Sequence, residues 1–270
     1  MPVKNKKKFR VSIVIPVYKL YEELVKNEIR LLKKIQNVFS SLSIIVILPK
    51  SLEKNWRQNC VFNLVAFDDF FFKNKDTYSL LLSNKIFYQA FDSFDYIQII
   101  QTDCWVFENN LEYFCNLGFD YIGAPWMVGG FEGRPLKKLW KVGNGGFSLR
   151  KVNTFLSILD KIHNTNMGKL PVFKDLHSGF LRFLKNVGVR NNLRHYLKKT
   201  PGEDIFWCIY IPHVFSQDEF KIADLDTAAN YSFEVHPEYL YNKITNNNLP
   251  MGCHNWLQHD KSFWQKYIKY

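Results

Sequence analysis

Four short motifs contain residues whose chemistry suits a binding or catalytic site. Some of their side chains can hold a metal ion or accept a proton, and their glycines let a ligand approach the backbone. The motifs are Gln101-Thr102-Asp103, Gly143-Asn144-Gly145-Gly146, Glu203-Asp204 and Gly252-Cys253-His254. Carboxylates and imidazoles are ligands for Mn²⁺-like ions, and a carboxylate can also act as a general base. Glycines let a ligand come close to the backbone. Each motif alone is a weak signal, and it is their combination that indicates a catalytic site.

Asp103 and His254 are the predicted metal ligands. Asp103 follows an apolar run, and a cation held by a carboxylate can neutralise the charge that develops on a leaving diphosphate. A common motif for this purpose is Asp-x-Asp, but Gln101 takes its first position here, so only Asp103 supplies an anionic ligand. A neutral imidazole at His254 could complete a site for Mn²⁺ or Mg²⁺. The alternatives are a capping aspartate and an ordinary core or surface histidine, with other candidates at His236, His213 and His177.

Glu203 and Asp204 are the predicted catalytic pair. They open an expected helix after Pro201-Gly202. Acidic side chains at a helix start also complement the helix dipole, so a purely structural role is the alternative. In the functional interpretation, Asp204 is the general base that deprotonates an acceptor hydroxyl as it attacks the anomeric carbon of a sugar. An inverting enzyme needs such a base, whereas a retaining enzyme does not.

The glycine motif and two tryptophans form the predicted acceptor side. Gly145 and Gly146 permit close approach of the backbone to a ligand, and Asn144 could hydrogen-bond a sugar hydroxyl. Trp126 and Trp256 offer apolar ring faces on which a sugar can stack. The alternatives are a plain tight turn at the glycines and core packing for each aromatic ring. The spacing also differs from the G-x-G-x-x-G pattern of dinucleotide-binding folds.

The predicted donor site uses residues near the ends of the first strands. A nucleotide base would be held at the end of the first strand, and tyrosine or lysine side chains on the helix before the Asp103 strand could reach the base or phosphates. Core or surface packing is the alternative for these side chains. The donor-binding candidates are Pro16, Tyr18, Tyr78, Lys85, Thr102 and Asp103.

The first half of the chain alternates buried apolar runs with amphipathic patterns. The patterns predict strands over 11–17, 43–48, 63–67 and 96–101, and helices over 21–39 and 78–91. This β-α-β-α-β order predicts a mostly parallel sheet with helices on both faces. Ligands bind outside the carboxyl ends of such strands, which is where Asp103 stands.

The second half is less regular. Its patterns predict strands over 120–124 and 147–150, helices over 152–163 and 204–211, and a strand-like stretch over 222–233. A Gly-rich basic loop is expected over 127–142, and an insertion or acceptor-side element over 164–200. The sequence contains no internal repeat and no clear linker. We therefore expect one domain over 1–270, with a donor half at about 1–107 and an acceptor and catalytic half at about 108–270.

Composition and charge restrict the class of protein and its partners. The chain has 270 residues, of which 47% are hydrophobic and 23% charged, and this argues against disorder. Its net charge of +11 favours anionic partners. Because no zinc-finger spacing, RNA-binding signature or long basic stripe is present, nucleic acid is not an expected partner. The basic cluster over 4–10 could give peripheral association with an anionic membrane surface.

Cysteine usage and hydropathy indicate a cytoplasmic protein. The five cysteines show no C-x-x-C spacing, which argues against a disulfide framework and a structural zinc site. No apolar run approaches the roughly 20 residues of a spanning helix. The first apolar run is short and lacks a cleavage site, so it reads as a strand and not a signal peptide. We expect the cytoplasm, with the inner face of the cytoplasmic membrane as a further option.

Four strings resemble those of a known family. They are Tyr121 to Trp126 (YIGAPW), Gly143 to Arg150 (GNGGFSLR), Glu203 to Trp207 (EDIFW) and Leu249 to His254 (LPMGCH). Over about 78–256, the chain resembles a bacterial family of largely uncharacterised domains from surface-polysaccharide gene products, placed with type A glycosyltransferases. The resemblance implies a GT-A-like nucleotide-binding α/β fold, a mixed and mostly parallel sheet flanked by helices. It also implies metal-assisted transfer to a glycan, with Asp103 at the metal, Asp204 as base and His254 as a candidate ligand.

These observations support one leading hypothesis and two alternatives. The leading hypothesis is an inverting glycosyltransferase that moves a sugar from a nucleotide-diphosphate donor, a UDP-sugar, to a glycan or lipid-linked glycan acceptor. The product would belong to a bacterial surface polysaccharide. The first alternative is a retaining glycosyltransferase. The second is a non-catalytic module that binds glycan or nucleic acid through its positive charge and aromatic residues.

Overall fold

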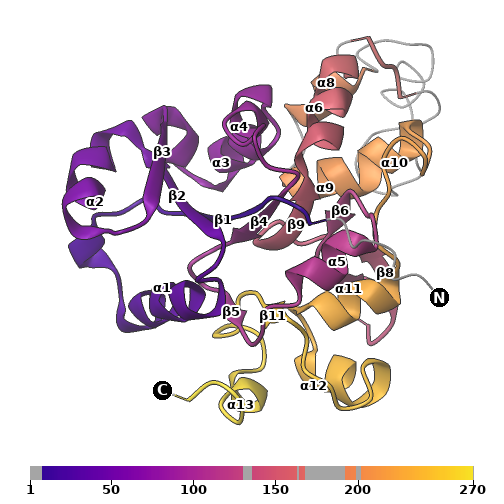
Figure 1. Ribbon diagram of the computed structural model, residues 1–270. Helices are drawn as coiled ribbons and strands as arrows, with labels where there is room; N and C mark the ends of the chain where they lie inside the picture. The colour runs from indigo at the N-terminus through magenta and orange to yellow at the C-terminus, as the bar shows by residue number, and fades with distance from the viewer. Residues whose placement is uncertain (1–7, 130–135, 163, 168–191, 199–201, 270) are drawn as a thin grey trace.

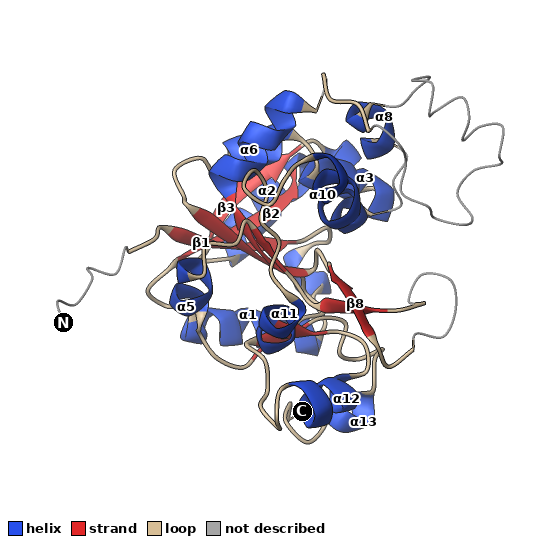
Figure 2. Cartoon of the chain, turned by 90° about the vertical axis from the view of Figure 1, so that its right-hand side faces the viewer, coloured by secondary structure: helices blue, strands red, loops and turns tan. Residues whose placement is uncertain are grey.

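A computed structural model gives the fold of residues 8–129, 136–162, 164–167, 192–198 and 202–269 (Figure 1). Within these residues the main sheet has six strands in the order β3-β2-β1-β4-β9-β6. Helices lie on both sides of it, as the side view in Figure 2 shows. The strands are β1 (Val11–Pro16), β2 (Ser43–Pro49), β3 (Asn63–Phe67), β4 (Tyr96–Ile100), β6 (Tyr121–Ile122) and β9 (Phe147–Lys151).

Strands β1 to β4 are parallel and mostly buried on both faces. β1 pairs with β2 and β4, and β2 pairs with β3. Continuous apolar runs suit such strands, because helices cover both sides of a parallel sheet. Only the edge strand β3 is largely half-buried or exposed. All four strands lie within one residue of their predicted bounds.

Strand β9 runs antiparallel between β4 and β6, and this makes the sheet mixed. Ile100, the last residue of β4, lies opposite Phe147, the first residue of β9. The glycine motif that precedes β9 therefore lies beside the Gln101-Thr102-Asp103 turn that follows β4. The predicted fold class, a mixed and mostly parallel sheet flanked by helices, is confirmed.

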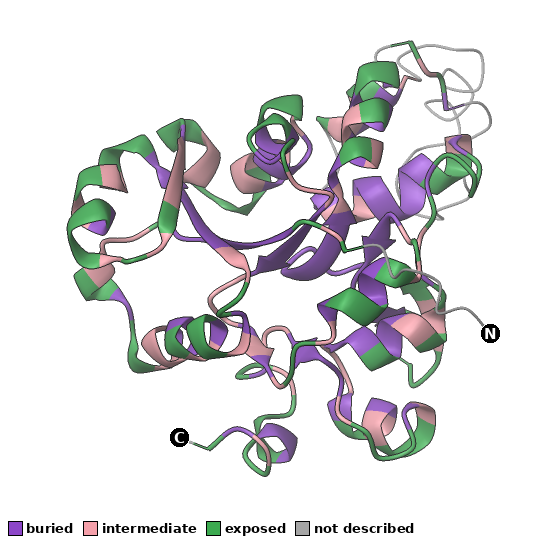
Figure 3. Ribbon diagram, in the orientation of Figure 1, coloured by how far each residue is buried: buried purple, intermediate pink, exposed green. Residues whose placement is uncertain are grey.

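The helices pack on the sheet through two apolar clusters. Figure 3 shows the buried sheet between largely exposed outer helix faces. Ile13 and Ile15 join one cluster with α1, α2 and α5, whereas Val14 joins the other with α3, α4 and α6. A π-helical turn at Phe206–Tyr210 connects α9 to α10. The helices are α1 (Lys26–Val38), α2 (Glu53–Asn59), α3 (Lys75–Leu82), α4 (Lys85–Gln89), α5 (Leu111–Asn116), α6 (Val152–Lys161), α8 (Leu193–Leu197), α9 (Glu203–Ile205), α10 (Ile211–Val214), α11 (Leu225–Tyr231), α12 (Pro237–Tyr239) and α13 (Lys261–Trp264).

Three predicted elements differ from the structure because side-chain caps and turns interrupt them. The helix predicted over 78–91 is split into α3 and α4, since the Asn84 side chain accepts a hydrogen bond from the Ile86 N–H and starts a new helix. The helix predicted over 21–39 begins only at Lys26, after a separate short turn. The strand-like stretch predicted over 222–233 is mostly helix α11, which Asp224 caps by accepting from the Thr227 N–H at 2.7 Å.

Two further expectations concern loops. The predicted loop over 127–142 contains β8 (Leu139–Val142), which pairs with β7 (Pro125–Met127), while 130–135 lie outside the described residues. Most of the insertion predicted over 164–200 also lies outside them, including 168–191. Among the residues that the structure describes, no helix is long and apolar enough to cross a membrane.

A small second sheet joins the C-terminal part of the chain to the end of β4. It consists of β10 (Ser232–Phe233), β11 (Gly252–Cys253) and β5 (Trp105–Val106). β11 pairs in parallel with β10 and antiparallel with β5. A third apolar cluster, which includes Trp256 and Trp264, packs behind it. This arrangement brings the end of β11 close to the turn after β4.

Candidate functional site

The turn after β4 holds Asp103 at the carboxyl edge of the sheet. The Cys104 N–H donates to the Gln101 carbonyl at 3.0 Å and closes the turn. Thr102 anchors it, because its hydroxyl donates to Glu28 of α1 at 2.9 Å. The Asp103 side chain is 45% exposed, although its Oδ1 atom is buried and makes no hydrogen bond to the described residues. Asp103 therefore has a carboxylate available for a ligand where the sequence predicts it.

His254 reaches Asp103 because of the register of the small sheet. Cys253 lies opposite Trp105 of β5 and beside Phe233 of β10. The next residue, His254, is therefore close to the segments that adjoin both of these strands. Its Nε2 lies 3.4 Å from Asp103 Oδ1, and its Nδ1 lies 2.9 Å from Glu234 Oε1. The two predicted metal ligands, 151 residues apart in sequence, are thus neighbours in space.

The glycine motif packs directly against Gln101 and His254. The Gln101 N–H donates to the Gly146 carbonyl at 2.9 Å. A Cβ atom on Gly146 would lie 2.3 Å from His254 Nε2 and 2.8 Å from Gln101 Oε1, so only glycine fits there. Asn144 has a positive φ of 62°, and its Oδ1 accepts from the Gly146 N–H at 3.0 Å. The Asn144 amide nitrogen is buried without a hydrogen bond to the described residues.

Glu203 lies beneath the same motif, paired with a buried arginine. Arg150 of β9 donates to Glu203 Oε1 at 2.9 Å, and their side chains are 0% and 6% exposed. A Cβ on Gly145 would lie 1.8 Å from Glu203 Oε1, so glycine is needed here too. Burial raises the pKa of Glu203 to about 7, against the opposing effect of Arg150. Its second oxygen, Oε2, is buried and makes no hydrogen bond to the described residues.

Asp204 is the half-buried neighbour at the start of α9. Its Oδ1 accepts from the Ile205 N–H at 2.9 Å. Burial raises the pKa of Asp204, and the negative charge of Glu234 raises it further. A raised pKa makes a carboxylate a stronger base, provided that it is ionised. The charge of Asp204 also raises the pKa of His254, so the two side chains interact electrostatically.

The side chains around His254 fit a divalent cation. Its Nε2 faces two acceptor oxygens, Asp103 Oδ1 at 3.4 Å and Gln101 Oε1 at 3.2 Å. Oxygen and imidazole nitrogen are the ligands that Mn²⁺ and Mg²⁺ accept in proteins. Cys104 Sγ also lies within 4.8 Å of the ligand atoms of Asp103 and His254. However, the Cys104 thiol donates to the Gly146 carbonyl, and burial raises its pKa well above the usual range. Cys104 is therefore a poor ligand.

The His254 imidazole and the Glu234 carboxylate shift each other's pKa. Burial alone would lower the pKa of His254, but the hydrogen bond and charge of Glu234 outweigh it and the pKa is raised. Burial would raise the pKa of Glu234, but the hydrogen bond to His254 outweighs it and the pKa is lowered. The lowered pKa of Glu234 favours its ionised form, which can only accept a hydrogen bond from Nδ1 of His254.

Several other predicted site residues have mainly packing contacts. The rings of Trp126 and Trp140 stack at 6.2 Å, and Trp126 also covers Gly143. Trp256 is buried with its ring edge-on to Trp105 at 6.4 Å. The acceptor roles predicted for Trp126 and Trp256 are not tested by these contacts and stay predictions.

The predicted donor-binding residues lie in different surroundings. Pro16 ends β1, and Tyr18 beyond it is 63% exposed. The Tyr78 hydroxyl is buried close to Gln101, and burial raises its pKa. Lys85 instead forms an exposed ion pair with Asp160 of α6 at 2.5 Å, so the structure does not bring it to the cluster.

Sequence reasoning missed two charged residues of the site. Glu234 directly follows the stretch over 222–233 that was expected to be strand-like, and its link to His254 depends on the pairing of β10 with β11. Arg150 stands in a short apolar strand inside the string GNGGFSLR. A charge in such a strand is itself a signal, because buried arginines need an anionic partner.

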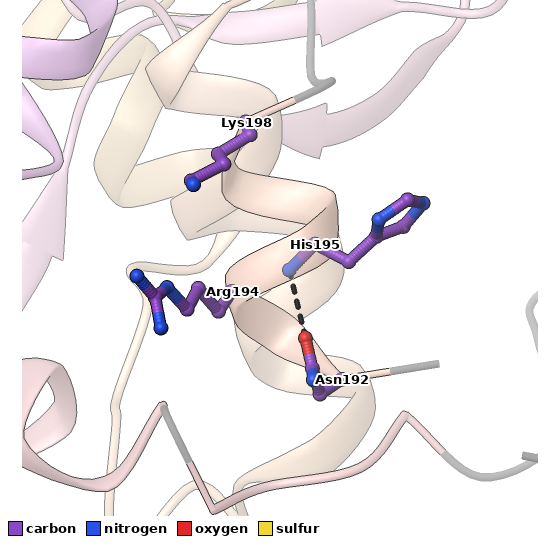
Figure 4. Close-up of a pocket in the computed structure, with 4 residues that line it drawn as sticks. All are labelled: Asn192, Arg194, His195 and Lys198. Atoms are coloured by element: carbon purple, nitrogen blue, oxygen red, sulfur yellow. Dashed lines mark hydrogen bonds between the residues drawn. The ribbon is translucent and has the colours of Figure 1, made fainter. Parts of the chain in front are cut away.

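A separate pocket lies at α8, where the described residues resume after a gap. Figure 4 shows its lining, which is formed by Asn192, Arg194, His195 and Lys198. The Asn192 side chain caps the helix by accepting from the His195 N–H at 2.9 Å. These residues belong to the segment over 164–200 that the sequence predicts to be an insertion or acceptor-side element, and that role stays a prediction.

Comparison with known proteins identifies the family. The model of the family described as "Protein of unknown function (DUF5672)" matches residues 61–254. Because the match covers well over half of the chain, the chain belongs to this family. No curated protein matches it. The part of the resemblance that predicted a largely uncharacterised family is confirmed.

Several solved structures are similar in fold at low identity. A glycosyltransferase involved in glycosylation of the major capsid of PBCV-1 is 11% identical, with 95% of this chain and 97% of that chain covered and a TM-score of 0.47. Mouse xyloside xylosyltransferase 1 is 11% identical, with 90% and 96% covered and a TM-score of 0.45. The galactosyltransferase LgtC, in complex with donor and acceptor sugar analogs, is 10% identical, with 90% and 86% covered and a TM-score of 0.45. Any activity of this chain must be derived from the residues of its own site.

Proposed function

We propose that this DUF5672 protein is an inverting glycosyltransferase that uses a nucleotide-diphosphate sugar, a UDP-sugar, as donor. One observation carries the proposal. A metal-ligand pair, Asp103 and His254, lies at Gly146, and Glu203, the neighbour of the half-buried carboxylate Asp204, lies at Gly145 of the same motif, at the carboxyl edge of the sheet. This edge is where α/β sheets bind ligands. The proposed acceptor is a glycan or lipid-linked glycan of a bacterial surface polysaccharide.

Asp103 and His254 would hold Mn²⁺ or Mg²⁺, with Gln101 Oε1 as a neutral oxygen ligand. The ion would supply positive charge against the diphosphate as it leaves. Gln101 takes the place of a second acidic residue, and its amide oxygen lies 3.2 Å from His254 Nε2. The substitution therefore keeps an oxygen at this position while it removes one negative charge.

Asp204 would act as the general base. The acceptor oxygen forms a bond to the anomeric carbon on one face of the sugar, while the bond from that carbon to the diphosphate oxygen breaks on the other. The bonding electrons leave with the diphosphate, and the acceptor proton passes to the Asp204 carboxylate. The raised pKa of Asp204 strengthens it for this task.

Buried polar atoms around the glycine motif would select the sugar. Glu203 Oε2 and the Asn144 amide nitrogen are both buried and make no hydrogen bond to the described residues. A buried polar atom without a partner costs about 1–3 kcal/mol, so hydroxyl groups of a bound sugar would be stabilised by them. Such contacts discriminate strongly between sugars that differ in one hydroxyl.

Replacement of Asp204 by asparagine tests this function. We expect Asp204→Asn to lower kcat by a factor of about 10²–10⁴, because the base is lost, while donor affinity measured by calorimetry stays near that of the wild type. Wild-type kcat should rise with pH through a value above the usual aspartate range, as Asp204 ionises, and the variant should lack this rise. Asp160→Asn, which changes an exposed aspartate on α6, is the matched control.

Two results would contradict the proposal. A normal kcat in Asp204→Asn would remove the base assignment. A product whose anomeric configuration by NMR matches that of the donor would show retention, and the inverting mechanism would be wrong.

A further inference from the structure

His254 lies in a narrow space between two sets of oxygen atoms. Its Nδ1 contacts Glu234 Oε1 at 2.9 Å, and its Nε2 faces Asp103 and Gln101 at 3.4 and 3.2 Å. Its side chain is 14% exposed and lies against Gly146. The ring therefore has little freedom to turn, and the position of its proton decides what Nε2 can do.

A neutral imidazole carries its proton on one nitrogen only, and the other nitrogen keeps the lone pair that binds a metal. An ionised carboxylate only accepts hydrogen bonds, so contact with Glu234 requires the proton to be on Nδ1. Without Glu234, the oxygens of Asp103 and Gln101 would attract that proton to Nε2. The proton would then block the nitrogen that faces Asp103.

The placement of Glu234 brings a third carboxylate to a site that already contains Asp103 and Asp204. Its charge raises the pKa of Asp204. Burial opposes the charge of Glu234 itself, but the hydrogen bond to His254 outweighs burial and lowers its pKa, so this contact offsets the repulsion between the like charges. The backbone fixes the placement, because the His254 N–H donates to the Phe233 carbonyl at 3.0 Å, next to Glu234.

We propose that Glu234 is a positioning residue, which holds the His254 proton on Nδ1 and so leaves Nε2 free to bind a divalent cation beside Asp103. This inference rests on the metal site of the proposed function and assigns a role to a residue that does not itself contact the metal. Carboxylates that orient a ligating histidine in this way typically change metal affinity by 10–100-fold.

Two measurements test the role of Glu234. The tautomer of His254 is read from ¹⁵N NMR of histidine-labelled protein, at a pH where the ring is neutral and without metal. The dissociation constant of Mn²⁺ alone is measured by calorimetry. We expect the wild type to carry the proton on Nδ1, and Glu234→Ala to move it to Nε2 and raise the Kd by about 10–100-fold.

Conservative and remote variants complete the design. Glu234→Gln keeps an oxygen that can accept from Nδ1, so we expect it to restore much of the affinity that Glu234→Ala loses. Glu219→Ala, which removes an exposed glutamate paired with Lys161, should leave both the tautomer and the Kd unchanged. Thermal unfolding without metal checks that every variant is folded.

The outcomes separate the failure of this inference from that of the proposed function. A wild-type proton on Nε2 would overturn the role of Glu234 without the use of any variant. An unchanged tautomer or an unchanged Kd in Glu234→Ala would overturn it as well. If the wild type binds no Mn²⁺, the metal-binding part of the proposed function fails and the assignment of Glu234 to a metal site falls with it.

Discussion

At the scale of single residues, the ion pair between Arg150 and Glu203 connects helix α9 to strand β9 of the sheet. Arg150 is completely buried, and it also donates to the Ser148 and Tyr88 hydroxyls, each at 3.0 Å. Glu203 adjoins Asp204, so the pair fixes the start of α9 relative to the glycine motif. A buried charge of this kind is strongly unfavourable when its partner is removed.

Replacement of Arg150 by methionine should therefore be strongly destabilising. We expect Arg150→Met to lower the free energy of unfolding by about 3–5 kcal/mol, because Glu203 is left buried without a counter-ion. Lys161→Met, which breaks an exposed pair with Glu219, is the matched control and should leave it nearly unchanged. Urea denaturation compares them. A value for Arg150→Met as small as that of the control would contradict the stabilising role of the pair.

The sequence singled out several side chains of the candidate site but not the side chains that they contact. Asp103, His254, Glu203 and Asp204 could be picked out because their residue types carry chemistry at the ends of predicted elements. Their partners depend on the order and register of strands, which the sequence pattern does not specify. Glu234 belongs to the site only because β10 pairs with β11.

At the scale of elements, the antiparallel pairing of β4 with β9 builds the centre of the site. The end of β4 and the start of β9 lie opposite each other, so the turn with Asp103 and the glycine motif are held in contact. The small sheet adds His254 from the other side. Gly146 lies at the meeting point of these three segments and has no room for a side chain.

Substitution of Gly146 by alanine should damage the site without unfolding the protein. The added Cβ would displace His254, and we expect turnover to fall by about 10²-fold, since small misplacements of catalytic groups have effects of this size. Gly118→Ala is a control outside the site, because the positive φ of 73° strains an alanine there but the added atom meets no neighbour within 4 Å. Equal turnover in the two variants would contradict the role of Gly146.

The strands with continuous apolar runs could be predicted from the sequence. The elements that depend on a side-chain cap or on pairing with a distant strand could not. β1 to β4 could be placed because buried parallel strands are continuously apolar. α11 was missed because its helical start depends on the cap at Asp224. β8 was missed because a short, half-exposed strand such as Leu139–Val142 is specified mainly by its partner β7.

At the scale of the whole molecule, the charge of the site opposes that of the chain. The chain carries a net charge of +11, whereas the site places Asp103 and Glu234 beside one imidazole, on which the charge of Asp204 also acts. An anionic diphosphate would be repelled by these carboxylates unless a cation lay between them. The positive charge of the remaining surface favours the approach of an anionic donor. The charge distribution thus supports a donor that binds together with a metal ion.

The central claim is that the site binds a nucleotide-sugar donor together with a metal ion. A thermal-shift panel of nucleotide diphosphates and nucleotide sugars, with and without Mn²⁺, tests this claim most directly. A ligand at 100 times its Kd adds about 2.7 kcal/mol of stability, so a true donor is readily detected. We expect one nucleotide to stabilise the wild type only when Mn²⁺ is present, and Asp103→Ala to lose the shift while the control Asp160→Ala retains it. No shift with any nucleotide, or a shift that ignores both Mn²⁺ and Asp103, would contradict a metal-dependent nucleotide-sugar site.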